Sequence, residues 1–205
     1  MEIENNYEGA SIDIIRNEKN KIYLSLKKEN GKYSHYYNFR IKNNLDEQGI
    51  IYIKNITNSA YYKKESFSAP YIKENNQWKK VEEYVIDDKG RLVLKVKQKT
   101  TCEISLLPRY VQKNLDEFIE KNNLNNLKIS KNPLNEIIIG DRNLPSVVIV
   151  ARQHPGETLS SFFVEEIIQE KINDTKLKNK LRSEKNRNNI NKKIITKNNG
   201  VLNSN

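Results

Sequence analysis

An apolar strand that leads through a short polar loop into a helix is the feature that most constrains this chain. Residues 147–150 (Val-Val-Ile-Val) form a short apolar run, and residues 159–168 repeat apolar side chains at helical spacing. The loop between them contains His154 and Glu157, three residues apart. Because ligands of open α/β sheets bind beyond the carboxyl ends of the strands, a binding site is predicted in this loop.

The two side chains suit a metal ion. Imidazole and carboxylate both bind zinc, with bonds of about 2.0–2.2 Å. Pro155 fixes its own φ and Gly156 accepts a positive φ, so the loop can turn the imidazole of His154 and the carboxylate of Glu157 inward. On spacing alone, a polar turn in which Glu157 or Thr158 favours the positive end of the next helix is the simpler interpretation.

The wider string favours the metal site. Residues 151–158 read Ala-Arg-Gln-His-Pro-Gly-Glu-Thr after a strand. This string resembles the first metal-binding motif of the M14 zinc carboxypeptidases. It is most similar to the cytosolic carboxypeptidase branch, which includes enzymes that trim glutamates from tubulin tails. The resemblance implies that His154 and Glu157 are two of three protein ligands of a catalytic zinc. Arg152 occupies a matching position, where it either contacts substrate or pairs with a carboxylate.

The resemblance continues on both sides of the motif. Residues 128–140 resemble the two short strands before the motif strand, and residues 158–166 resemble the first catalytic-domain helix. Residues 199–205 match the family's N-P-D-G-V-x-x-G-N segment loosely, with Asn199 where Asp is usual and Ser204 where Gly is usual. Upstream, the family carries an all-β domain.

The family's remaining chemistry lies further along its sequence. A second histidine, a glutamate general base, an oxyanion-stabilising arginine and an Asn-Arg pair for the substrate carboxylate all follow the point that matches Asn205. No catalytic residue is therefore assigned within this chain. We expect a fragment of a zinc metallocarboxypeptidase, which releases C-terminal residues from peptides or proteins and is inactive alone. The alternative is a non-catalytic, protein-binding β-sandwich module with a degenerate peptidase remnant.

The first half of the chain reads as β structure. Short runs rich in Ile, Tyr and Phe alternate in polarity and are separated by polar turns, and residues 87–90 predict a hairpin turn. After Pro108 the apolar residues change from strand-like alternation to helical spacing, and residues 111–121 predict a helix. The predicted fold class is therefore a two-region α+β chain. An antiparallel β-sandwich at 1–108 precedes an α/β region at 109–205. The resemblance implies that this second region is the first part of an α/β zinc-carboxypeptidase domain.

The charge distribution and the cysteine content bear on the binding partners and the cellular location. Most of the net charge of +10 lies in residues 170–205, where Lys and Asn interleave without aromatic residues. We therefore expect a solvated tail, and we rank nucleic-acid binding well behind the peptidase and the protein-binding module.

Residues 188–196 have little apolar continuity, which argues against a well-packed central sheet. The sequence shows no signal peptide or membrane segment, and a single cysteine, Cys102, is expected to be a packed thiol. We therefore expect a cytoplasmic protein. His35 lies beside a predicted strand of the first region, and we expect that it binds no metal.

Overall fold

The chain divides into two compact units, Met1–Arg109 (unit 1) and Tyr110–Asn205 (unit 2). The structure is a computed structural model. It describes residues 1–28, 34–59, 62, 67–122, 124, 135–139, 146–154, 156–173 and 191–196. Within these residues, no helix has the length and apolar character that crossing a membrane requires.

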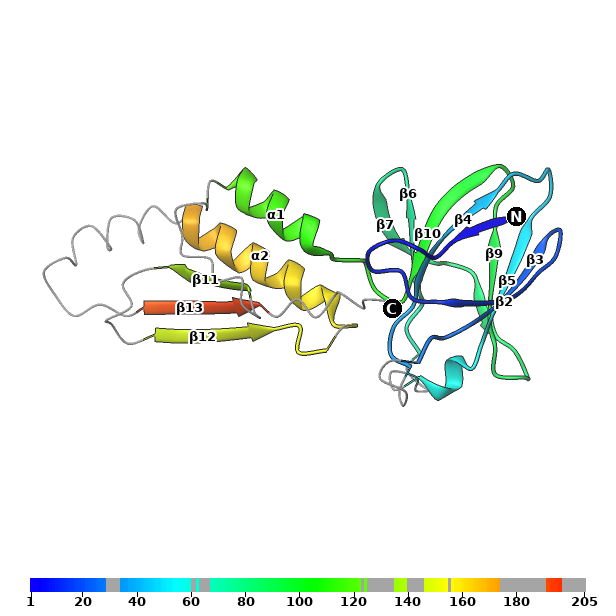
Figure 1. The fold of residues 1–205 in the computed structure, drawn as a ribbon, viewed down its shortest axis with the longest axis horizontal. Coiled ribbons are helices and arrows are strands. Elements are labelled where there is room, and N and C mark those ends of the chain that lie inside the picture. Colours follow the sequence, from blue (N-terminus) through cyan, green and yellow to red (C-terminus); the bar gives the residue numbers. More distant parts are fainter. Residues whose placement is uncertain are drawn as a thin grey trace, which may run out of the picture. The chain divides into compact units, whose positions relative to one another are not determined.

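Unit 1 is built from two five-stranded sheets (Figure 1). One has the order β1-β4-β10-β6-β7 and the other β2-β3-β5-β9-β8. The elements are β1 (Glu2–Glu4), β2 (Asp13–Asn17), β3 (Lys21–Ser25), β4 (Asn38–Asn43), β5 (Gly49–Lys54), the 3-10 turn η1 (Ile56–Asn58), β6 (Tyr71–Glu74), β7 (Gln77–Lys80), β8 (Tyr84–Ile86), β9 (Leu92–Val96) and β10 (Thr100–Ser105).

Alternation of polarity along the central strands creates the core of unit 1. Ile22 and Leu24 on β3 are fully buried, as are Ile51 and Ile53 on β5, whereas Tyr23 between the first two is only partly buried. A period of two residues places one set of side chains between the sheets and the other set outside. The predicted β-sandwich is therefore confirmed.

Two details of the sandwich differ from the expectation. β3 and β5 pair in parallel, because the intervening β4 belongs to the other sheet, so this sheet is mixed rather than purely antiparallel. β1, β6, β7 and β8 were not predicted, since each is only three or four residues long.

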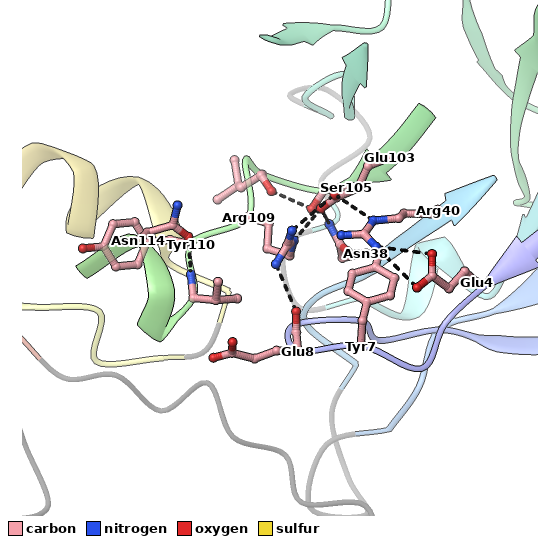
Figure 2. A network of polar contacts seen from close by, with 12 residues as sticks. Glu4, Tyr7, Glu8, Asn38, Arg40, Glu103, Ser105, Arg109, Tyr110 and Asn114 are labelled. Carbon is pink, nitrogen blue, oxygen red and sulfur yellow. Dashed lines mark hydrogen bonds and ion pairs between the residues drawn. The ribbon is translucent and has the colours of Figure 1, made fainter. Parts of the chain in front are cut away.

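A polar network around a buried carboxylate joins four segments of unit 1 (Figure 2). Glu103 on β10 is 5% exposed and accepts hydrogen bonds from Asn38 Nδ2 at 2.9 Å and from Arg109 Nε at 2.6 Å. Arg40 Nε lies 3.5 Å from the same carboxylate. The ring of Tyr7 lies beneath both guanidinium groups, with its hydroxyl donating to Asn38 Oδ1 at 2.5 Å. The N-terminal segment, β4, β10 and the end of unit 1 are thus held together.

Unit 2 combines two helices with a three-stranded sheet of order β11-β13-β12. Its elements are α1 (Gln112–Lys121), β11 (Asn135–Ile139), β12 (Ser146–Ala151), α2 (Thr158–Asn173) and β13 (Asn191–Thr196). The predicted helices and the motif strand are confirmed, and so is the order of a β region followed by an α/β region. Of the two short strands expected within residues 128–140, the first lies outside the described residues and the second corresponds to β11.

Part of segment 188–196, which has little apolar continuity, is nevertheless a strand. Residues 191–196 form β13, the central strand of the sheet, parallel to β12 and antiparallel to β11. The run Asn-Lys-Lys-Ile-Ile-Thr has little apolar alternation, so periodicity gave no signal. A strand between two partners is instead stabilised by backbone hydrogen bonds along both of its edges.

Apolar side chains from both helices and from β12 form the core of unit 2. Phe118 of α1 packs in one cluster with Ala151 of β12 and with Val164 and Ile168 of α2. The helices lie along one face of the sheet (Figure 1). This packing holds the carboxyl end of β12 against α2, and the candidate site lies in the loop that joins the two elements.

Candidate functional site

The loop between β12 and α2 begins at a strained backbone position. Arg152, the first residue after β12, has a φ of 53° in the left-handed region. Such a conformation is uncommon for a residue with a Cβ and needs support from surrounding contacts. Arg152 is only 5% exposed, and its Nη1 donates to the carbonyl of Tyr110 at 2.8 Å. The guanidinium is therefore anchored inside unit 2.

His154 and Glu157 face each other across this loop. The Nδ1 atom of His154 lies 2.7 Å from Oε1 of Glu157, and the backbone N–H of His154 donates to Oε2 at 3.2 Å. Their side chains are 63% and 39% exposed, so both are open to solvent. The hydrogen bond from His154 lowers the pKa of Glu157 below its usual value, and this carboxyl is thus favoured as an anion.

Ser160 links the two ends of the loop. Its hydroxyl accepts the backbone N–H of Arg152 at 2.9 Å and donates to the carbonyl of Glu157 at 2.6 Å. The N–H of Glu157 also donates to the carbonyl of His154 at 3.1 Å. The loop is thus closed by hydrogen bonds from its start to the first turn of α2.

Tyr110, at the start of unit 2, contacts both the loop anchor and α2. Its ring packs edge-on against Phe162, with ring centroids 5.0 Å apart, and its hydroxyl donates to Oε1 of Glu165 at 2.5 Å. Burial raises the pKa of Tyr110 and also that of Glu165, so the tyrosine stays protonated and can act as the donor. Motif spacing could not reveal Tyr110 or Ser160, because neither is a metal ligand or lies in the matched string.

The chemistry of the pair His154 and Glu157 fits a divalent cation such as zinc. One imidazole nitrogen and one carboxylate oxygen already converge, and the carboxyl is ionised, as a metal ligand must be. Among the residues that the structure describes, no group of three His, Cys, Asp or Glu side chains could hold a metal ion. His35 and Cys102 both lie in unit 1. The described part of the chain therefore offers two converging ligands, one fewer than a catalytic zinc generally uses.

Comparison with known families decides which family this is. The model of the cytosolic carboxypeptidase N-terminal domain matches residues 3–105, which is half of the chain. The chain belongs to this cytosolic carboxypeptidase family. The match covers nearly all of unit 1, so the β-sandwich itself carries the family signal, independently of the string at 151–158. A search of curated protein sequences gave no match.

Solved carboxypeptidase structures share the fold. A protein of Burkholderia mallei assigned as a carboxypeptidase superposes with a TM-score of 0.77 at 17% identity, over 95% of this chain and 53% of that one. One of Shewanella denitrificans assigned as a carboxypeptidase A gives 0.77 at 21% identity, with 95% and 54% covered. A metallo-carboxypeptidase from Pseudomonas aeruginosa, in complex with (2-guanidinoethylmercapto)succinic acid, gives 0.72 at 16% identity, with 95% and 54% covered.

These superpositions extend over both units, so the second unit has the fold of the first part of an α/β carboxypeptidase domain. The chain spans about half the length of each of these solved structures. The assignment of His154 and Glu157 as metal ligands, and of Arg152 as a substrate contact, stays a prediction.

Proposed function

We propose that this chain is part of a zinc metallocarboxypeptidase in which His154 and Glu157 are two of the metal ligands. The observation that carries the proposal is the convergence of these side chains, 2.7 Å apart, directly after β12 in a chain of the cytosolic carboxypeptidase family. The carboxyl end of a strand in an α/β sheet is where ligand sites form. The spacing that by itself fits a polar turn therefore supports a metal site in this setting.

In such a site, His154 would bind the metal through Nδ1 and Glu157 through its carboxylate. The hydrogen bond that now joins them would give way to two bonds to the ion. A bound zinc would supply a water of lowered pKa and would polarise the scissile carbonyl. The part played by this chain is to hold two ligands in place at the exposed end of β12.

The substrates we propose are the C-termini of peptides or proteins, because the family and its structural neighbours are named carboxypeptidases. The string at 151–158 supports the tubulin-deglutamylase branch as the finer assignment. The family name supports a cytosolic location. Arg152 is proposed as a substrate contact on the resemblance alone, whereas its hydrogen bond to Tyr110 supports an anchoring role instead.

We propose that residues 1–205 alone do not turn over substrate. The oxyanion arginine of the family matches no position here, and one such donor is typically worth about 3–4 kcal/mol. The general base also has no counterpart here, and it typically contributes a factor of about 10²–10⁴. Groups that act as a unit do not contribute additively, so the product of these losses sets no firm rate.

Zinc titration tests the ligand assignment. The chain should bind zinc weakly, because affinity follows the number and geometry of the ligands. His154→Ala should abolish this binding, whereas His35→Ala, a change in the other histidine of the chain, should leave it nearly unchanged. If His35→Ala removed the zinc site and His154→Ala did not, the assignment would be wrong.

Release of a free amino acid from a peptide with a C-terminal glutamate tests the activity. A chain extended through the following residues of its gene should release it in a chelator-sensitive manner, and residues 1–205 should not. Chelator-sensitive turnover by residues 1–205 would refute their inactivity. Absence of turnover by the extended chain would favour the alternative, a protein-binding β-sandwich with a degenerate peptidase remnant.

A further inference from the structure

We propose that Ser160 and Arg152 are positioning residues for the pair His154 and Glu157, with Ser160 closing the loop and Arg152 anchoring it. Neither side chain would touch the metal. The inference rests on the proposed function, since it assigns residues that orient the proposed ligands.

The position of the Ser160 hydroxyl carries the inference. One hydroxyl bridges the N–H of Arg152 and the carbonyl of Glu157, at 2.9 Å and 2.6 Å. It therefore fixes the separation between the residue that leaves β12 and the second proposed ligand. A serine in the first turn of a helix often bonds only to a carbonyl of its own turn. Here the same oxygen also accepts an N–H from outside the helix, which closes the loop around His154.

Arg152 provides the second constraint. Its backbone has a left-handed φ of 53° where the chain leaves the strand, and its Nη1 donates to the carbonyl of Tyr110 at 2.8 Å. Tyr110 is in turn held on α2 by its contacts with Phe162 and Glu165. The loop is thus anchored to two parts of the unit 2 core, through Ser160 at one point and Tyr110 at another.

These contacts limit how far the proposed ligands can move. Both ligand side chains are open to solvent, at 63% and 39% exposure, so packing against other side chains does not fix them. Their orientation depends on the backbone that carries them, and that backbone is set by the Ser160 and Arg152 hydrogen bonds. Groups that orient metal ligands without touching the metal typically change affinity by about 10–100-fold when they are removed.

Ser160→Ala is the decisive variant, because alanine is the better helix former and leaves α2 intact. Zinc affinity, measured by competition with a chromophoric chelator, should fall about tenfold. Ser161→Ala makes the same chemical change one residue along the helix and should leave affinity unchanged. Ser160→Thr keeps a hydroxyl and should restore most of the affinity.

A measurement on the metal-free chain separates positioning from metal binding. Hydrogen exchange at the amide of Arg152 should become faster in Ser160→Ala, because that N–H loses its acceptor, and should not change in Ser161→Ala. Arg152→Asn tolerates the left-handed backbone but cannot reach Tyr110, so it should also weaken zinc binding. Arg152→Lys retains one long donor and should bind zinc more tightly than the Asn variant.

Each outcome decides the inference. Zinc binding through His154 that is equally tight in wild type and Ser160→Ala would overturn the positioning role and leave the proposed function standing. Unchanged exchange at the Arg152 amide in Ser160→Ala would overturn it as well. Zinc binding that survives His154→Ala would overturn the proposed function and this metal-directed role together. Slower exchange in wild type, with weaker zinc binding only in the variants that break the loop contacts, would support the inference.

Discussion

Arg109 donates from Nε to the buried carboxylate of Glu103 at 2.6 Å, and this contact ties the last residue of unit 1 to strand β10 (Figure 2). The same guanidinium donates from Nη1 to the carbonyl of Glu8 at 3.1 Å. One side chain thus joins the N-terminal segment, a central strand and the point where the chain leaves the sandwich.

Glu103→Gln should destabilise unit 1 by about 2–4 kcal/mol, because hydrogen bonds to a buried charge are weakened and Arg109 loses its counter-ion, whereas Arg40 keeps its ion pair with Glu4. The measurement is the free energy of unfolding by urea at pH 7, followed by far-UV circular dichroism. Lys79→Gln removes the exposed ion pair with Glu74 and is a matched control that should cost less than about 1 kcal/mol. Equal costs for the two variants would contradict the role assigned to Glu103.

The same carboxylate should make stability depend on pH in the acid range. Burial by itself raises the pKa of Glu103, but hydrogen bonds from Arg109 and Asn38 outweigh it, so the pKa is below the usual 4.5. The stabilisation is therefore complete above pH 4.5 and is lost as pH falls through the lower folded-state value. Urea unfolding from pH 7 to pH 3 should show wild type losing more stability than Glu103→Gln below pH 4.5.

A stack of four side chains crosses the outer face of the mixed sheet and should stabilise it. Tyr23 and Tyr52 lie parallel with ring centroids 4.8 Å apart, and Arg16 and Arg91 cover the two outer ring faces at 4.5 and 4.7 Å. A double-mutant cycle with Tyr23→Leu and Tyr52→Leu should give a coupling free energy of about 0.5–1.5 kcal/mol. Additive single-variant costs would show that the rings contribute only by burial.

Cys102 should be inert in the folded chain. The thiol is buried, and burial raises its pKa to about 12, so almost no thiolate forms at neutral pH. Reaction with a disulfide reagent at pH 8 should be slow in native buffer and complete in urea. Fast labelling without denaturant would contradict a packed thiol and would show that β10 opens readily.

Residues 1–109 should fold without the rest of the chain. They have their own apolar core between two sheets, and the Glu103 contacts that close the unit are all internal to it. Expressed alone, this segment should unfold in a single cooperative urea transition. A non-cooperative transition would mean that the domain boundary predicted at 108–109 does not mark an independent folding unit.

Much of the fold could be predicted from local pattern. The alternation of Ile22 and Leu24 with polar neighbours indicated a half-buried strand, and the helical spacing of Leu115, Phe118 and Ile119 indicated α1. Both signals arise because one face of each element is buried, and that face repeats with the period of the backbone. β13 was not predicted because its sequence alternates little in polarity, and only its pairing with β11 and β12 shows that it is a strand.

For the candidate site, the sequence by itself determined the strand–loop–helix order and the three-residue spacing of His154 and Glu157. Only the tertiary structure brought Tyr110 into contact with Arg152, which lies 42 positions further along the chain. In unit 1 it likewise brought together Asn38 and Glu103, which are 65 positions apart. Local sequence fixes backbone periodicity and turn geometry within a few residues. Contacts between distant segments depend instead on which strands and helices pack together, and no short string of residues encodes that choice.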